Sequence, residues 1–322
     1  MLLSTIEVGK ERPVGGSKKQ PRERKPVLFM LAGFPDDHSV WTKLAAEFKT
    51  TFRVVVACLP DYDKRKPAKT AGHNLDEVLG AIIETVNAVT SADEKVTLVL
   101  HGWGCFFGYH YAGTRPEKVE AVVAFDSGLF PTRSKTSPKP KQKGKQTLTL
   151  KFSTGNLKNT AKRMLYQWVF AACFVLGNVL GTAMVSRAVI YPLWKFGAWV
   201  GYIHEPGEGW HMPECTPSKP IRTWMMYPYY YFWRDAFQGR QLAPPLPQCQ
   251  VLFLWGTGKR VMAHDASFLH ALDTSPWECA YAGVEGGHWF FIDQHRETVA
   301  LMKQFFASLK DRAAECPPVW CG

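Results

Sequence analysis

The stretch KVTLVLHGWG, residues 95–104, joins a run of apolar residues to a glycine-rich turn. Its first six residues are typical of a short strand that is buried on both faces of a parallel sheet. Gly102 and Gly104 follow at once, and a helical pattern then continues through Ala112. The stretch therefore predicts a strand that ends in a sharp turn and leads directly into a helix.

Outward from this turn, short apolar runs alternate with helical patterns. We expect strands over residues 26–32, 52–58, 95–100, 119–125, 251–255 and 278–282, and helices over 40–48, 75–89, 103–112, 266–272 and 296–309. Such alternation predicts an α/β protein with a doubly wound, mostly parallel sheet. Right-handed crossovers bring the strand ends to one edge of the sheet, where functional sites form.

The alternation stops after the fourth of these strands and resumes about 120 residues later, a length typical of an inserted subdomain. The interval begins with a Lys-rich run and continues as helices rich in Trp, Tyr and Phe. We expect it to form a helical cap over the sheet edge. The expected organisation is a disordered basic tail (1–25), a first core segment (26–128), the cap (129–247), a second core segment (248–310) and a C-terminal tail (311–322).

The net charge of +11 is concentrated in two runs. Residues 10–25 hold seven Lys or Arg against two acids, and residues 133–151 hold seven with no acid. Both runs are rich in Pro, Gly, Ser and Gln, which is typical of solvated, flexible chain. Attraction to anionic lipid is the alternative. We do not expect a nucleic-acid partner, because no nucleic-acid-binding motif is present and the aromatics are not interleaved with the charge.

The eight cysteines form no CxxC pair, and no His/Cys spacing suits zinc. We therefore expect no metal and no cofactor. Residues 1–10 are too short and too mixed for a signal peptide, so a cytoplasmic protein with free thiols is expected. Peripheral attachment to a membrane is the alternative.

An uncharged run of 20 residues, 166–185, is about as long as a membrane-spanning helix. Polar and small residues interrupt it, and it lies between two segments that must meet in one core. We therefore favour a cap helix that is buried or faces a membrane over one that spans it.

Four motifs in this order resemble the epoxide hydrolase and haloalkane dehalogenase branch of the α/β-hydrolase superfamily. They are GFPD at 33–36, LHGWG at 100–104, VLFLWGTGKRV at 251–261 and GGHW at 286–289. In that branch they correspond to the turn after the first core strand, the nucleophile elbow, the strand and loop that carry the acid, and the turn that holds the base. The resemblance covers about residues 26–310 and implies an α/β-hydrolase fold with an inserted helical cap.

The resemblance also implies roles for single residues. His288 would be the catalytic base, oriented by a carboxylate. The backbone N–H groups of Phe34 and Trp103 would form an oxyanion hole. Gly102 stands at the nucleophile position.

Three positions depart from the family pattern. Gly102 has no atom that can form a covalent intermediate, although glycine adopts the strained elbow backbone freely. Ala32 replaces the usual His, and residues 256–260 (GTGKR) hold no carboxylate where the acid is expected. Asp126, at the end of the strand after the elbow, is a candidate acid that would orient His288. A polar cap on the strand or the following turn is the alternative for Asp126.

Two phenols of the cap hold the epoxide oxygen in epoxide hydrolases, because a phenol can donate a hydrogen bond as the alkoxide forms. Tyr166 and Tyr230 match these phenols by context, and the choice among Tyr229, Tyr230 and Tyr231 stays open. Together with Trp103 they are the expected ligand contacts. Aromatic packing between cap helices is the alternative.

Three functions remain for such a chain. The first is a pseudoenzyme that binds a small apolar or lipid-like molecule under its cap. The second is an active ester or epoxide hydrolase in which His288 acts without a covalent intermediate. The third is a protein that docks on a membrane surface. We favour the first because of Gly102, and a carboxylate within hydrogen-bond reach of His288 would support the second.

Overall fold

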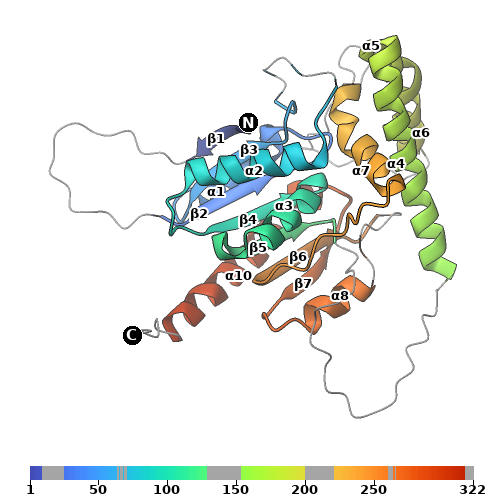
Figure 1. Ribbon diagram of the computed structural model, residues 1–322. Coiled ribbons are helices and arrows are strands. Elements are labelled where there is room, and N and C mark those ends of the chain that lie inside the picture. The colour runs from blue at the N-terminus through green and yellow to red at the C-terminus, as the bar shows by residue number, and fades with distance from the viewer. Residues whose placement is uncertain are drawn as a thin grey trace.

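The computed structural model describes residues 1–8, 25–63, 65, 68, 71–128, 154–199, 221–259, 264 and 266–315. Within these residues the strands are β1 (Ser4–Val8), β2 (Val27–Leu31), β3 (Arg53–Cys58), β4 (Val96–His101), β5 (Val119–Phe125), β6 (Gln250–Gly256) and β7 (Ala280–Val284). They form one sheet in the order β1-β3-β2-β4-β5-β6-β7. All neighbouring pairs are parallel except β1 and β3. The doubly wound, mostly parallel sheet is thus confirmed (Figure 1).

The antiparallel strand β1 corrects the expectation of a disordered tail over residues 1–25. Ser4–Val8 pairs along its whole length with β3. The physical reason is that an edge strand needs only a partner for its backbone hydrogen bonds and can remain half exposed. The rest of the predicted tail, residues 9–24, lies outside the described residues.

The central strands are buried because helices cover both faces of the sheet. In β2, Leu28 and Met30 belong to one apolar cluster, whereas Phe29 and Leu31 belong to the other. This alternation follows from the period of two in a strand. The first cluster includes residues of α1 (Thr42–Phe48), α9 (Phe290–Asp293) and α10 (His295–Glu315), and the second includes residues of α2 (Leu75–Val89), α3 (Trp103–Thr114) and α8 (Ala266–Asp273).

A local sequence signal explains where helix α2 begins. Helix α2 starts at a capping box, in which the Asn74 side chain accepts from the Glu77 backbone N–H and the Glu77 carboxylate accepts from the Asn74 backbone N–H. Helix α10 ends at Glu315, so it extends beyond the expected core boundary at residue 310. Short 3-10 turns at His38–Trp41 and Pro116–Lys118 complete the described core.

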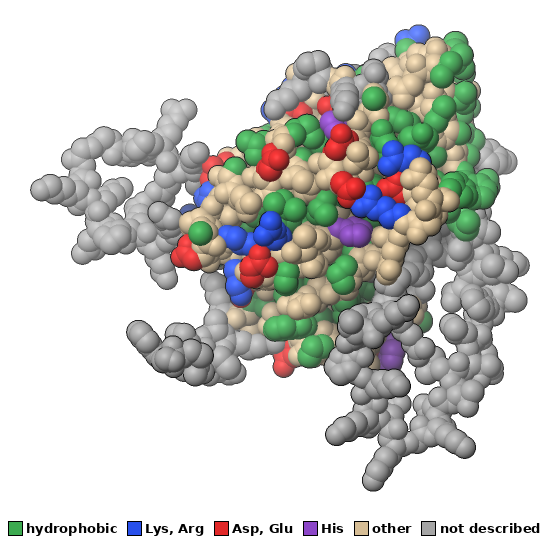
Figure 2. All heavy atoms as spheres, viewed as in Figure 1, with side chains coloured by type: hydrophobic (Ala, Val, Ile, Leu, Met, Phe, Trp, Pro, Cys, Tyr) green, Lys and Arg blue, Asp and Glu red, His purple; other side chains and the backbone are tan. Residues whose placement is uncertain are grey.

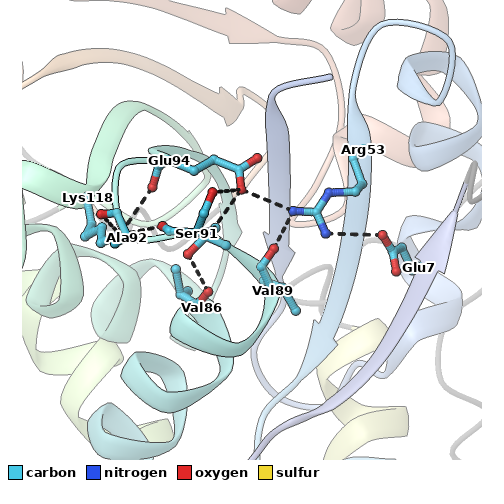
Figure 3. Close-up of polar contacts among 9 residues, drawn as sticks. Glu7, Arg53, Val86, Val89, Ser91, Ala92, Glu94 and Lys118 are labelled. Atoms are coloured by element: carbon cyan, nitrogen blue, oxygen red, sulfur yellow. Dashed lines mark hydrogen bonds and ion pairs between the residues drawn. The ribbon is translucent and has the colours of Figure 1, made fainter. Parts of the chain in front are cut away.

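A polar network fixes one end of the sheet (Figure 3). The Arg53 guanidinium on β3 donates to the carbonyl of Val89 at the end of α2 and lies 3.4 Å from Glu7 of β1 and 3.5 Å from Glu94. Lys118 donates to the carbonyl of Ser91 at 2.9 Å, which ties the turn before β5 to the turn before β4. The network therefore stabilises the strand end that lies opposite the elbow.

The described part of the cap is helical and stands at one end of the sheet (Figure 1). It consists of α4 (Thr154–Leu180), α5 (Thr182–Val185), a π turn (Ser186–Ile190), α6 (Tyr191–Trp199), a 3-10 turn (Thr223–Met226) and α7 (Tyr227–Phe237). Gly181, at φ 91°, separates α4 from α5. The Lys-rich start of the cap, residues 129–153, lies outside the described residues.

Hydrogen bonds from tyrosines hold the cap on the core. The Tyr62 hydroxyl donates to the carbonyl of Met225, and the Tyr227 hydroxyl donates to the carbonyl of Pro60 at 3.2 Å. Among the described residues, no helix is both long enough and apolar enough to cross a membrane. The cap helix expected over 166–185 is α4, which begins earlier, at Thr154, and ends at Leu180.

Candidate active site

The turn between β4 and α3 has the backbone geometry of a nucleophile elbow. Gly102 precedes the first residue of α3 at φ 58° and ψ −124°, in a region that L-residues rarely adopt and glycine adopts freely. A Cβ atom added to Gly104 would lie 2.1 Å from the carbonyl oxygen of Leu31. Helix α3 can therefore approach β2 this closely only because residue 104 has no side chain.

The space above Gly102 is open enough for the first atom of a side chain. A Cβ built there would have as its nearest neighbours Nε2 of His288 at 3.6 Å and Cα of Gly33 at 3.8 Å, which are ordinary contacts. A nucleophile at this position would thus stand beside the imidazole. Because residue 102 is glycine, it offers no atom that could attack a substrate.

The structure brings Asp126 and His288 together. Asp126 follows β5 at a positive φ of 69°, and its backbone N–H donates to Leu254 at 2.7 Å. Its carboxylate is fully buried and is hydrogen-bonded to Nδ1 of His288. A carboxylate therefore lies within reach of the imidazole, as the position of Asp126 after the strand indicates. The contact fits the expected orienting role of Asp126, and the catalytic role of His288 stays a prediction.

A second partner of Asp126 comes from the loop where the family carries its acid. The Lys259 ammonium contacts the same carboxylate oxygen as His288 does, and the backbone N–H of Gly256 donates to the other oxygen at 3.4 Å. Burial raises the pKa of Asp126, but Lys259 and His288 outweigh it and hold the pKa below its usual range. The sequence analysis assigned no role to Lys259. The available signal was its position in the loop at 256–260, where the family pattern has a carboxylate and this sequence has none.

The imidazole of His288 is a weak base in this setting. Burial, and then the nearby His101, lower its pKa to about 4. His288 is therefore neutral at pH 7, and Nδ1 carries the proton because the ionised Asp126 accepts from it. The unprotonated Nε2 faces the space above Gly102.

Beneath the site, a buried polar chain connects the first turn to the base turn. His101 is fully buried; its Nε2 lies 3.0 Å from the carbonyl oxygen of His288, and its Nδ1 lies 3.4 Å from the Asp36 carboxylate. The Trp289 indole donates to Asp36 at 2.9 Å. Sequence reasoning did not identify this chain, although Asp36 and Trp289 belong to two of the four motifs. It stabilises the position of His288 through the backbone.

The two expected oxyanion donors come from adjoining backbone segments. A Cβ added to Gly33 would lie 2.1 Å from the backbone nitrogen of Trp103, so the turn after β2 touches the start of α3. Phe34 follows directly on this contact. The backbone of the turn after β2 therefore lies next to that of Trp103, and the role of the Phe34 and Trp103 N–H groups as oxyanion donors stays a prediction.

Aromatic rings from the cap cover these residues. The centroid of the Tyr229 ring lies 5.0 Å from that of Trp103 and 5.6 Å from that of Phe34. The ring centroids of Tyr166 and Tyr229 are 6.3 Å apart. Tyr230, in contrast, packs against Phe174 at 5.1 Å. Of the three neighbouring tyrosines, Tyr229 is therefore the one above the site. Burial raises the pKa of Tyr229 well above its ordinary value, so the phenol remains a donor.

Cys105 is a core residue and not a replacement nucleophile. Its thiol is fully buried and donates to the carbonyl of Phe125 at 3.4 Å. Burial raises its pKa, which disfavours the reactive thiolate. Asp265 lies outside the described residues. Among the described residues, no group of three or more His, Cys, Asp or Glu is arranged to hold a metal ion.

Comparison with protein families assigns the fold. Residues 28–301 match the model of the "Alpha/beta hydrolase family", and the chain belongs to this family. The AB hydrolase superfamily protein YfhM of Bacillus subtilis is 29% identical over 107 residues, which are 33% of this chain and 37% of that protein. Epoxide hydrolase 4 of Mus musculus is 27% identical over 103 residues, 32% of this chain and 28% of that protein. The matched region thus spans about a third of these relatives.

Solved structures agree over nearly the whole chain. A crystal structure of the Bacillus megaterium epoxide hydrolase in complex with an inhibitor superimposes with a TM-score of 0.60 at 18% identity, covering 95% of this chain and 96% of that one. A haloalkane dehalogenase variant from Bradyrhizobium elkanii gives 0.56 at 15% identity, covering 97% and 99%. The likeness confirms the α/β-hydrolase fold that the four motifs predict.

Proposed function

We propose that this protein binds a small apolar or lipid-like molecule above Gly102 and does not form a covalent intermediate there. The observation that carries the proposal is that the residue at the crest of the elbow has no side chain, whereas the surrounding framework keeps its geometry. A nucleophile is the one component of the covalent mechanism that neither a base nor an oxyanion hole can replace.

The charges around His288 support the same conclusion. In a triad, an unpaired carboxylate stabilises the imidazolium that forms when the base accepts a proton. Here Lys259 neutralises Asp126, and the pKa of His288 is lowered to about 4. Such an imidazole accepts a proton from water or an alcohol only weakly at pH 7.

The side chains that cover the site favour an apolar ligand. The rings of Phe34, Phe170 and Tyr229 pack against one another at centroid distances of 5.1 to 5.6 Å, and Trp103 adjoins them. A largely aromatic lining with a few polar groups is typical of small-molecule sites. The Tyr229 hydroxyl and the backbone N–H groups at Phe34 and Trp103 would supply the polar contacts.

A binding experiment with a matched pair of variants tests this proposal. The fluorescent fatty acid cis-parinaric acid serves as the probe, and we expect saturable binding by the full chain. Tyr229→Ala should weaken this binding about tenfold, because it removes a ring that covers the site. Tyr230→Ala should leave it unchanged, since Tyr230 packs on Phe174 instead. Absence of saturable binding, or equal loss in both variants, would contradict the proposal.

A second candidate function is direct hydrolysis by water. The hydrogen bond between Asp126 and His288 favours it, because this bond presents the Nε2 lone pair of His288 to the space above Gly102. A water bound there could attack an ester or epoxide without a covalent intermediate. Turnover of 4-nitrophenyl acetate or styrene oxide that His288→Ala abolishes would establish this function and exclude the first. Rates equal to those of His288→Ala would exclude the second.

A further inference from the structure

Helix α4 has two apolar faces, and the described chain covers one of them. Cys173 and Phe174 are buried, and Gly177 lies so close to Thr223 that an added Cβ would be 2.0 Å from the Thr223 hydroxyl oxygen. This side packs against α7 and the 3-10 turn before it. A helix with an amphipathic pattern would be polar on its other side.

The other side of α4 is apolar and exposed. We call it the outer face, and its members are Leu165, Trp168, Val175, Leu176, Val179 and Leu180. Because successive helical residues are about 100° apart, these six positions fall within one arc of the helix surface. Val179 is 75% exposed and Leu165 is 64% exposed. Figure 2 shows hydrophobic side chains along the outer margin of the cap, where Figure 1 places α4 and α5.

The apolar surface continues from α4 onto α7. The ring of Trp168 packs 5.4 Å from that of Trp233, which in turn lies 5.9 Å from that of Phe237. Phe237 is 77% exposed. Continuous exposed apolar surface of this kind marks an interaction site on a folded protein, whereas single exposed residues need no explanation.

The charge of the surrounding chain indicates the partner. Between Ser127 and His204 the sequence has no Asp or Glu, but it has seven Lys or Arg in 133–151, three in 158–163, and Arg187 and Lys195. The two cations in described helices, Arg187 and Lys195, are exposed. An apolar helix face in a strongly cationic, acid-free stretch is typical of helices that lie in the surface of an anionic bilayer. Two copies of such a surface would repel each other.

We infer that the outer face of α4, together with Phe237, docks on the surface of an anionic lipid bilayer. The apolar side chains enter the boundary between headgroups and acyl chains, and the cations of the acid-free stretch attract the acidic lipids. The helix lies along the surface and does not span it, in agreement with its length and hydropathy. This inference concerns the outside of the cap and is independent of what the site above Gly102 binds.

Vesicle flotation with the full chain tests this inference. We expect the protein to float with vesicles of phosphatidylcholine containing 30% phosphatidylserine at low salt, and not with vesicles of phosphatidylcholine alone. Raising the salt to 1 M, where the Debye length is about 3 Å, should release most of it. Failure to float with the anionic vesicles at low salt would overturn the inference, and so would equal flotation with both kinds of vesicle.

A matched pair of double variants locates the docking surface. Val179→Ser with Leu180→Ser should reduce the partition coefficient at least about tenfold, because two exposed aliphatic side chains lose their burial in lipid. Leu2→Ser with Trp277→Ser changes two residues that are comparably exposed on the core and should have no effect. Equal flotation of the two double variants would overturn the inference.

Sedimentation equilibrium without lipid separates a bilayer from a second copy of the chain. We expect a monomer, and the same monomer for both double variants. A dimer that Val179→Ser with Leu180→Ser dissociates would assign the outer face to self-association and overturn the inference. All four substituted residues are exposed, so folded variants are expected, and circular dichroism checks this.

Discussion

The elbow at Gly102 follows β4 and the loop at 256–259 follows β6, on the other side of β5 in the same sheet, yet they depart from the family pattern in different ways. The elbow keeps its backbone and lacks its reactive side chain. The loop lacks its carboxylate and presents Lys259 to a carboxylate that comes from the end of β5. The elbow is thus defined by its backbone geometry, whereas the loop contributes one member of a buried charge pair.

Different physical constraints act on the elbow and on the loop. Close backbone contacts at Gly33 and Gly104 maintain the elbow, and these contacts do not depend on what residue 102 can do. The loop is constrained by electrostatics, because a buried carboxylate requires partners wherever it is placed. Four experiments test this distinction, beginning with the variant that should lose the most stability.

Gly104→Ala tests the packing of the elbow. The added Cβ would lie 2.1 Å from the carbonyl oxygen of Leu31, and backbone cannot yield as a flexible side chain can. We expect the free energy of unfolding to fall by about 4 kcal/mol, as overpacking against backbone is among the severe changes. Urea denaturation measures it. Gly80→Ala is the control, because nothing lies within 4 Å of its added Cβ, and a change there should be neutral or slightly stabilising. Similar losses in both variants would contradict the packing argument.

Lys259→Met tests the ion pair between the loop and Asp126. It leaves the fully buried Asp126 without its cation, and breaking a buried pair costs about 3 kcal/mol. Removal of Lys259 also raises the pKa of His288, so protonated His288 can replace the lost charge at lower pH. The loss of stability should therefore be larger at pH 8 than at pH 5.

Lys303→Met is the control for this charge pair. Lys303 lies 3.4 Å from Glu47 on the surface, with a side chain that is 57% exposed, and its loss should cost less than about 1 kcal/mol. If Lys259→Met lowered the free energy of unfolding as little as Lys303→Met does, or equally at both pH values, the ion pair between Lys259 and Asp126 would not stabilise the loop.

Acid should destabilise the protein through His288. Its pKa is about 4 when folded and about 6.5 when unfolded, so between these values only the unfolded chain binds the proton. The free energy of unfolding is therefore expected to fall by about 2–3 kcal/mol as the pH falls from 7 to 4. The lowered pKa of Asp126 acts in the same direction at still lower pH. Urea denaturation across this range measures the slope, and His288→Gln should flatten it.

Gly102→Asp places a carboxylate at the elbow. The positive φ should cost about 1–2 kcal/mol of stability, measured by thermal unfolding. The new carboxylate would stand beside Nε2 of His288 and could open styrene oxide by forming an ester bond to carbon, which intact mass spectrometry detects as the mass of one epoxide. Gly102→Asn should have a similar cost in stability and form no adduct. An adduct on the unchanged protein would instead reveal a nucleophile outside residue 102.

The fold and the framework of the site could be predicted from sequence because they rest on short-range patterns. Apolar runs followed by glycine turns fix the parallel strands, and the order of four motifs fixes their arrangement. Asp126 could be predicted because the ends of adjacent parallel strands meet at one edge. Strand β1 escaped prediction because its half-polar sequence becomes a strand only by pairing with β3.

Two features could not be predicted from such short-range patterns. They are the position that a long side chain reaches and the rotation of a helix about its own axis. Successive helical residues point about 100° apart, so motif context cannot decide whether Tyr229 or Tyr230 faces Trp103. The absence of a carboxylate in the loop at 256–259 was visible, but nothing in the sequence states that Lys259 extends to Asp126. The partial exposure of α4 likewise depends on which of its two apolar sides meets α7.

Strand β1 has one further consequence, for how the protein can be handled. Strand β3 pairs with β2 along one edge and with β1 along the other. Strand β1 therefore occupies backbone hydrogen-bonding groups of β3 that would otherwise be open. A version shortened past Val8 would leave that row of amides and carbonyls open as a template for strands of other molecules. Affinity tags or truncations at this end should therefore be chosen to preserve the pairing, because its loss would promote aggregation even if the site stayed intact.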